Sequence, residues 1–166
     1  IYTVAFGKDA DQKTLRWIAE QTGGSFFPAG IFNLGFVYRK INIVAHNGSV
    51  YRSYNDFIFP GQTLSYNIPV ELDMRKVGFF VHWQGSRMEM VLLAPDNTRI
   101  TRRNIANFGK YVEGETYACF EIENPQRGNW QVVISGYELP PKGEQVNFLS
   151  FCESDVFSNI LGFQPQ

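Results

Sequence analysis

The sequence predicts a mainly β protein, an antiparallel two-sheet β-sandwich preceded by a strand and two helices left from an α/β domain. Apolar residues recur at helical spacing before Ser49 and at every second position after it. The second part also breaks into short apolar stretches separated by Pro, Gly, Asp and Asn, which is typical of antiparallel strands joined by turns. These observations divide the chain into an α/β segment, residues 1–48, and a sandwich domain, residues 49–166.

The chain opens with a predicted strand and helix. Residues 1–6 are β-branched and aromatic, which favours a strand. Asp9 and Gln12 have the spacing of a capping box, so the first helix is predicted to begin there. Gly23 and Gly24 are predicted to end it in a left-handed C-cap.

A second helix is predicted after the stretch SFFPAG, so that two helices follow one strand. Its apolar positions follow a helical period, and Asn47 with Gly48 closes it. The predicted buried face consists of Leu34, Val37, Tyr38, Ile41, Val44 and Ala45.

From Ser49 onward about seven or eight strands are predicted, the number expected of a two-sheet sandwich. The stretch KVGFFVHWQG alternates, which places Val77, Phe79, Val81 and Trp83 on the buried side. His82 falls on the opposite side and is predicted to be a surface or rim histidine.

Composition and motifs argue against several functions. Lys and Arg number 15 against 16 Asp and Glu without runs of like charge, so no nucleic-acid partner is expected. No apolar stretch approaches the roughly 20 residues of a membrane span. His46 and His82 lack metal-site spacing, and no G-x-S-x-G elbow occurs, so no catalytic or metal residue is assigned and an enzyme is not expected. Cys119 and Cys152 permit one disulfide without requiring it.

The stretch IYTVAFGKDADQKTLRWIAEQTGGSFFPA resembles the last βα unit of a von Willebrand factor A domain, and the next predicted helix is similar to the closing helix of that fold. The resemblance implies that the front of the α/β domain is missing, and the absence of an initiator Met agrees with a fragment or a processed product. In that family a DxSxS motif begins the metal site, and this sequence has none. No cofactor is therefore expected here, and a divalent metal, Mg²⁺ or Ca²⁺, would belong to the missing part.

The second part resembles the β-sandwich that follows the A domain in calcium-activated chloride channel regulators, hemicentins and related bacterial and archaeal surface proteins. The residues that carry this resemblance are LLAPDN and FEIENPQRGNWQVVISG. Chloride channel regulators also carry an HExxH metalloprotease helix, which is absent here. The resemblance implies an extracellular or cell-surface location.

We expect a non-catalytic protein-interaction or structural module of a larger surface or secreted adhesion-type protein. Two alternatives are a carbohydrate-binding sandwich and an accessory domain of a secreted hydrolase. Candidate ligand or interface residues are Trp17, Tyr111, Tyr117 and Tyr137, and a coplanar pair among the tyrosines would favour sugar binding.

Expected partners are a protein ligand or the rest of the parent chain. The strand over residues 1–6 would leave unpaired backbone groups if it stood alone. It is therefore expected either to join an edge of the sandwich or to pair with the same segment of a second copy, which gives a homodimer.

Overall fold

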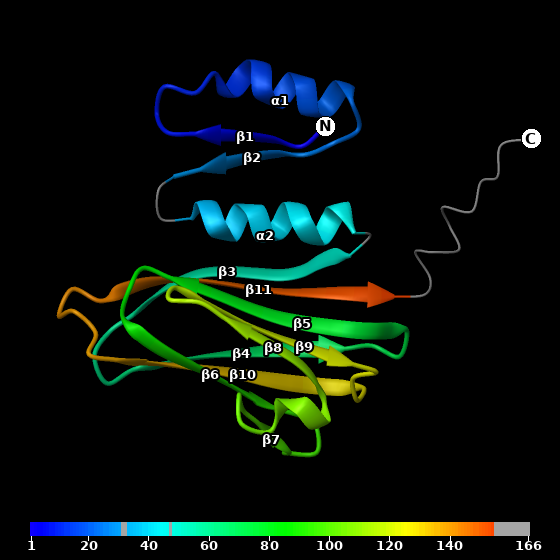
Figure 1. Ribbon diagram of the computed structural model, residues 1–166, viewed down its shortest axis with the longest axis vertical. Helices are drawn as coiled ribbons and strands as arrows, with labels where there is room; N and C mark the ends of the chain where they lie inside the picture. Colours follow the sequence, from blue (N-terminus) through cyan, green and yellow to red (C-terminus); the bar gives the residue numbers. More distant parts are fainter. Residues whose placement is uncertain (31–32, 47, 155–166) are drawn as a thin grey trace, which may run out of the picture.

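The computed structural model describes residues 1–30, 33–46 and 48–154. Figure 1 shows, from top to bottom, helix α1, a two-stranded sheet, helix α2, a five-stranded sheet and a four-stranded sheet. The two lower sheets are antiparallel and pack face to face, so the predicted mainly β sandwich is confirmed. Asn47 and the last twelve positions of the predicted sandwich domain, residues 155–166, lie outside the described residues.

The N-terminal segment is a βαβα unit made of β1 (Thr3–Phe6), α1 (Gln12–Gln21), β2 (Phe26–Ala29) and α2 (Leu34–Ala45). β1 and β2 pair in parallel, with Thr3 opposite Phe26. The prediction that two helices follow a single strand was therefore wrong, because SFFPAG contains β2. The expectation that residues 1–6 join the sandwich was also wrong, since β1 pairs with β2, while the homodimer stays a prediction.

Helix α1 begins two residues later than the capping-box spacing indicates. Its N-cap is Asp11, not Asp9, because the Asp11 carboxylate accepts hydrogen bonds from the Thr14 amide at 3.1 Å and the Thr14 hydroxyl at 2.7 Å. The predicted C-terminus is confirmed. Gly23 has a φ of 66°, and the amides of Gly23 and Gly24 close the last turn on carbonyls of α1.

Helix α2 buries a different face from the predicted one. Phe36 and Ile43 are buried against the five-stranded sheet, although neither belongs to the predicted stripe. Val37, within that stripe, is buried as well, whereas Tyr38 is 59% exposed. The reason is the position of α2 between two sheets, which requires apolar residues on two sides of the helix (Figure 1).

The sandwich consists of two antiparallel sheets. The five-stranded sheet has the order β3 (Ser49–Ile58), β11 (Glu144–Ser154), β5 (Met74–Trp83), β9 (Tyr117–Glu123), β8 (Gly109–Glu113). The four-stranded sheet has the order β4 (Thr63–Val70), β10 (Gly128–Tyr137), β6 (Arg87–Leu93), β7 (Arg99–Ile100). A 3₁₀ turn, Ile105–Asn107, connects β7 to β8.

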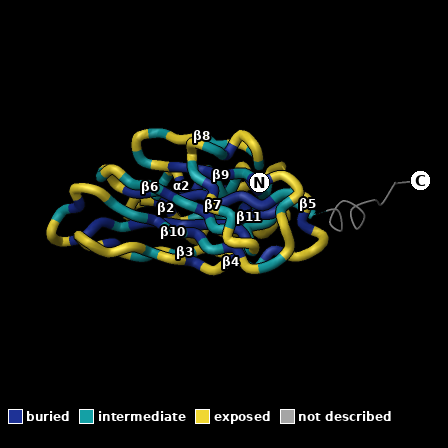
Figure 2. Tube along the Cα trace, turned by 90° about the horizontal axis from the view of Figure 1, so that it is seen from below, coloured by how far each residue is buried: buried dark blue, intermediate teal, exposed yellow. Residues whose placement is uncertain are grey.

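The main core lies between these two sheets. Val77, Phe79, Val81 and Trp83 are all buried in it, as the alternation predicts. Phe79 meets Trp130 of the facing sheet with ring centroids 5.9 Å apart. In Figure 2 the dark blue buried positions follow strands such as β10 and β11, and the exposed positions gather in the peripheral loops. No helix of the described residues has the length and apolar character needed to cross a membrane.

Candidate binding site

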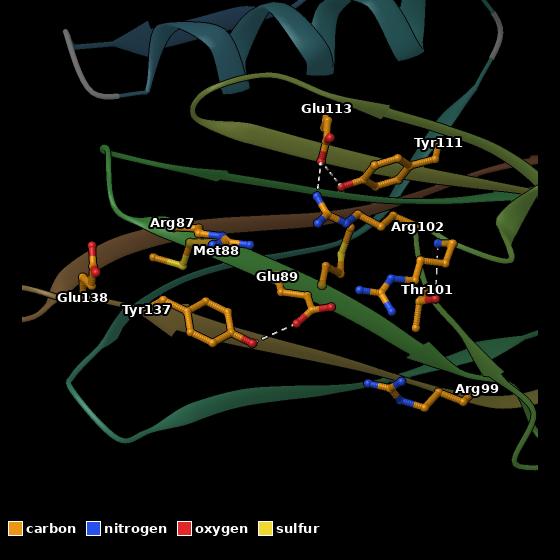
Figure 3. Close-up of a pocket in the computed structure, with 12 residues that line it drawn as sticks. Arg87, Met88, Glu89, Arg99, Thr101, Arg102, Tyr111, Glu113, Tyr137 and Glu138 are labelled. Atoms are coloured by element: carbon orange, nitrogen blue, oxygen red, sulfur yellow. Dashed lines mark hydrogen bonds and ion pairs between the residues drawn. The ribbon is translucent and has the colours of Figure 1, made fainter.

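A pocket of about 570 Å³ lies where the edges of the two sandwich sheets meet. β6 pairs with β10 along its whole length but with β7 only at Leu92 and Leu93, so the start of β6 is an edge. β8 is the last strand of the five-stranded sheet. The pocket opens between these two edges (Figure 3), and it is lined by Arg87, Met88, Glu89, Met90, Arg99, Thr101, Arg102, Arg103, Tyr111, Glu113, Tyr137 and Glu138.

One wall comes from the outer face of the four-stranded sheet. Tyr137 of β10 stands opposite Arg87 of β6, and its hydroxyl donates to Glu89 Oε2 at 2.9 Å. Arg87 Cζ lies 5.7 Å from the centroid of the Tyr137 ring. The hydrogen bond to Glu89 raises the pKa of Tyr137, so this phenol remains a hydrogen-bond donor. The ring is therefore held in place while its side chain stays 47% exposed.

The opposite wall comes from β8 and the segment before it. The Tyr111 hydroxyl donates to Glu113 Oε2 at 2.7 Å, and Arg102 Nη1 lies 3.8 Å from the same oxygen (Figure 3). The Tyr111 ring packs against Phe120 with centroids 4.6 Å apart. Burial and the hydrogen bond to Glu113 raise the pKa of Tyr111, so both pocket tyrosines keep their protons.

Arginine is the most frequent residue in this pocket. Three of the four, Arg99, Arg102 and Arg103, are close in the sequence. A tight turn after β7 holds this segment at the pocket. In that turn Asn104 Oδ1 accepts the Thr101 amide at 2.7 Å. Of the four pocket arginines, Arg102 forms an ion pair, with Glu113, whereas Arg87, Arg99 and Arg103 form none within the described part of the chain.

Sequence reasoning found part of this site. Tyr111 and Tyr137 line the same pocket, but no ring contact joins any two of the candidate tyrosines within the described part of the chain. Tyr117 lines a different cavity, and Trp17 lies on α1, where it is 60% exposed. The arginines were missed, although the stretch TRITRRN carries a local basic cluster that signals them.

The second cavity, of about 900 Å³, lies between α2 and the outer face of the five-stranded sheet. Arg39 of α2 reaches Glu121 Oε1 at 2.7 Å and Cys119 Sγ at 3.4 Å. His82 lines this cavity on the outer side of the five-stranded sheet, as the alternation predicts, and it is half-buried beneath α2. A Cβ at Gly35 would come 3.6 Å from its Nε2, and burial lowers the pKa of this imidazole.

The two cysteines are free and lie on opposite faces of the five-stranded sheet. Cys119 belongs to the cluster under α2 and Cys152 to the main core. Burial raises the pKa of Cys119 to about 12, and burial also raises the pKa of Cys152. Neither thiol is therefore ionised at neutral pH.

We expect both thiols to resist alkylation in the folded protein at pH 8, since the thiolate is the reactive form. Iodoacetamide labelling followed by intact-mass measurement should add no label within the time that fully labels the protein in guanidinium chloride. Rapid labelling of either cysteine without denaturant would contradict the burial of that residue.

Within the described ranges, no group of three or more His, Cys, Asp or Glu side chains could hold a metal ion. The pocket lining offers several kinds of group that can contact a ligand. Guanidinium and phenol groups supply donors, carboxylates supply acceptors, and the tyrosine rings supply apolar surface.

No family model and no curated protein matches the chain. Among solved structures, the lipase BlEst2 of Bacillus licheniformis in propeptide form is similar over 65% of this chain and 23% of the lipase, with 15% identity and a TM-score of 0.47. PliG, a periplasmic inhibitor of g-type lysozyme from Aeromonas hydrophila, matches 63% of this chain and 84% of its own, with 14% identity and a TM-score of 0.34.

A low-affinity xylan-binding module, CBM86 of Roseburia intestinalis, matches 69% of this chain and 94% of its own, with 9% identity and a TM-score of 0.32. Likenesses at this level of identity and superposition assign no function.

Proposed function

We propose that the protein is a non-catalytic interaction and structural module of a larger surface or secreted protein, in which an α/β unit is joined firmly to a β-sandwich. The observation that carries this proposal is the burial of α2 on the outer face of the sandwich. Phe36 and Ile43 of α2 form one apolar cluster with Leu149 of β11. The ion pair between Arg39 and Glu121, at 2.7 Å, links the same two parts.

We further propose that the α/β unit is the C-terminal part of a von Willebrand factor A-like domain. Its parallel β1–β2 pair and its helix order support this proposal. Thr3 donates its amide to the carbonyl of Ser25, just before β2, at 3.0 Å, and Gly7 donates to Ala29 of β2 at 3.2 Å. Successive amides of a strand point to opposite edges, so those of Val4 and Phe6 point away from β2. That edge of β1 is suited to a further strand of the parent protein.

Hydrogen exchange tests this edge. In this chain alone, we expect the amides of Val4 and Phe6 to exchange rapidly while those of Thr3 and Gly7 are protected, because only the latter donate to carbonyls of residues 25–29. In the longer parent protein all four should be protected.

The matched variant is Phe6→Pro, which removes an amide that β2 does not use and blocks strand addition. It should leave the protection of Thr3 unchanged. If Val4 and Phe6 are already protected in a chain that sediments as a dimer, the homodimer through residues 1–6 replaces this proposal. If they are protected in a monomer, the edge is not open and the proposal fails.

A second candidate function is carbohydrate binding by the sandwich. It is favoured by the pocket that holds Tyr111 and Tyr137, whose rings are fixed by hydrogen bonds to Glu113 and Glu89. Sugar rings pack their C–H faces on aromatic rings, while their hydroxyls need donors and acceptors nearby. Glycan-array binding that is lost in Tyr137→Ala would support this function, and an array without signal would contradict it.

A further inference from the structure

The arginines of the pocket supply more positive charge than its own carboxylates neutralise. Arg87, Arg99 and Arg103 line a cavity of about 570 Å³ and form no ion pair in the described part of the chain. A guanidinium group is always charged and matches the planar geometry of a carboxylate through two parallel hydrogen bonds. The pocket is therefore suited to a ligand that carries an anionic group.

The carboxylates of the same pocket restrict the kind of anion. Glu89 and Glu113 each receive a tyrosine hydroxyl on Oε2, which leaves the other oxygen of each able to accept a hydrogen bond from a ligand. Glu138 adds a third acceptor in the lining. A peptide rich in Asp or Glu would bring its carboxylates close to these three. A polyhydroxylated ligand instead supplies the hydroxyl donors that they require.

The shape of the pocket agrees with a saccharide. Its volume lies within the range of roughly 300–1,000 Å³ found for small-ligand sites. Tyr137 presents an exposed ring on a strand, next to Arg87 on the neighbouring strand (Figure 3). Met88 and Met90 contribute apolar lining that suits the C–H surface of a sugar ring.

We propose that this pocket binds an acidic saccharide, whose uronic carboxylate contacts the unpaired arginines and whose hydroxyls contact Glu89 and Glu113. The proposal rests on the second candidate function, carbohydrate binding, and adds the class of sugar.

The test compares two oligosaccharides that differ chiefly at one carbon. Trigalacturonate carries a carboxylate at C6 of each unit, and galactotriose carries a hydroxyl there. In calorimetric titrations of this chain at low salt we expect trigalacturonate to bind at least tenfold more tightly. This difference should shrink as salt is raised toward 1 M, because exposed charges are then screened.

The variants locate the binding site. Arg99→Gln and Arg103→Gln should each weaken trigalacturonate binding several-fold and leave galactotriose unchanged. Arg127→Gln is the matched control, since Arg127 is exposed and does not line the pocket. Equal thermal unfolding midpoints of the three variants would show that the fold is intact.

The possible outcomes separate the acidic class of the sugar from carbohydrate binding itself. Equal binding of both sugars overturns the acidic class and keeps carbohydrate binding. Absence of binding for both at millimolar concentration overturns both. Tight trigalacturonate binding that is insensitive to Arg99→Gln and Arg103→Gln overturns the assignment to this pocket. Equally tight binding of a hexaglutamate peptide overturns the choice of a saccharide.

Discussion

Replacement of Glu144 by alanine should lower the free energy of unfolding at pH 7 by about 3 kcal/mol, because several hydrogen bonds converge on one carboxylate. Glu144 begins β11 and is only 4% exposed. Its Oε1 accepts the amides of Gln84, Gly85 and Ser86 at 2.8, 2.7 and 3.1 Å. These amides belong to the turn between β5 and β6, so the carboxylate fixes the turn that leads into the candidate pocket.

The same carboxylate should make stability depend on pH. Burial raises the pKa of Glu144, but the hydrogen bonds from Ser86, Gly85 and Gln84 outweigh it, so the pKa in the folded state is below the usual value. The unfolded state, with a pKa of about 4.3, then binds more protons. The stabilisation is complete above that pH and is lost as the pH falls through the folded-state pKa.

Urea denaturation of the wild type and Glu144→Ala at pH 7 measures the loss of stability, and the same measurement on the wild type and Glu144→Gln at several pH values between 7 and 3 measures the pH dependence. The stability difference between the two should be largest near pH 7 and shrink in acid. Glu138→Gln is the control, since Glu138 is exposed and lies close in the chain. A Glu144→Gln protein as stable as the wild type at pH 7 would show that the negative charge is not needed, because the Gln side-chain oxygen can still accept the amides. A Glu144→Ala protein as stable as the wild type would show that the three amides find acceptors elsewhere.

The sequence predicts the inner face of the sandwich better than its outer face. Alternation in β5 correctly places Phe79 in the main core. The same alternation predicts solvent on the other side, yet Phe80 and Leu149 are buried there beneath Phe36. An alternating pattern of residues in a strand indicates that one face is apolar. It does not indicate that a helix from another part of the chain covers the second face.

Neither strand β2 nor the pocket could be predicted from the sequence, and the reasons are related. β2 has four residues and contains Pro28, so its local pattern indicates a connection, and its parallel pairing depends on β1. The pocket unites segments from β6, the turn after β7, β8 and the end of β10. Exposed tyrosines can be proposed from their position in a strand, as for Tyr111 and Tyr137. Their meeting with Arg99 and Arg103 depends on strand order, which local periodicity does not contain.

Leu149→Ala should lower the free energy of unfolding by a similar amount. The parts of the chain in which this variant changes hydrogen exchange test the division at Ser49. Leu149 is fully buried between the sandwich and α2, so its truncation should cost about 2–5 kcal/mol. Leu92→Ala is the matched control. Leu92 is equally buried, but it lies in the main core between the two sandwich sheets.

The two variants should differ in native-state hydrogen exchange, monitored at Ile43 in α2 and at Val132 in β10. If residues 1–48 can detach while the sandwich stays folded, exchange at Ile43 reports detachment and exchange at Val132 reports detachment plus unfolding of the sandwich. Leu149→Ala weakens the contact between the two parts, so the opening free energy should fall at both sites. Leu92→Ala weakens only the sandwich, so the opening free energy should fall at Val132 and remain unchanged at Ile43. An equal fall at Ile43 in both variants would mean that the α/β segment and the sandwich unfold as one cooperative domain, and the boundary predicted at Ser49 would then be wrong.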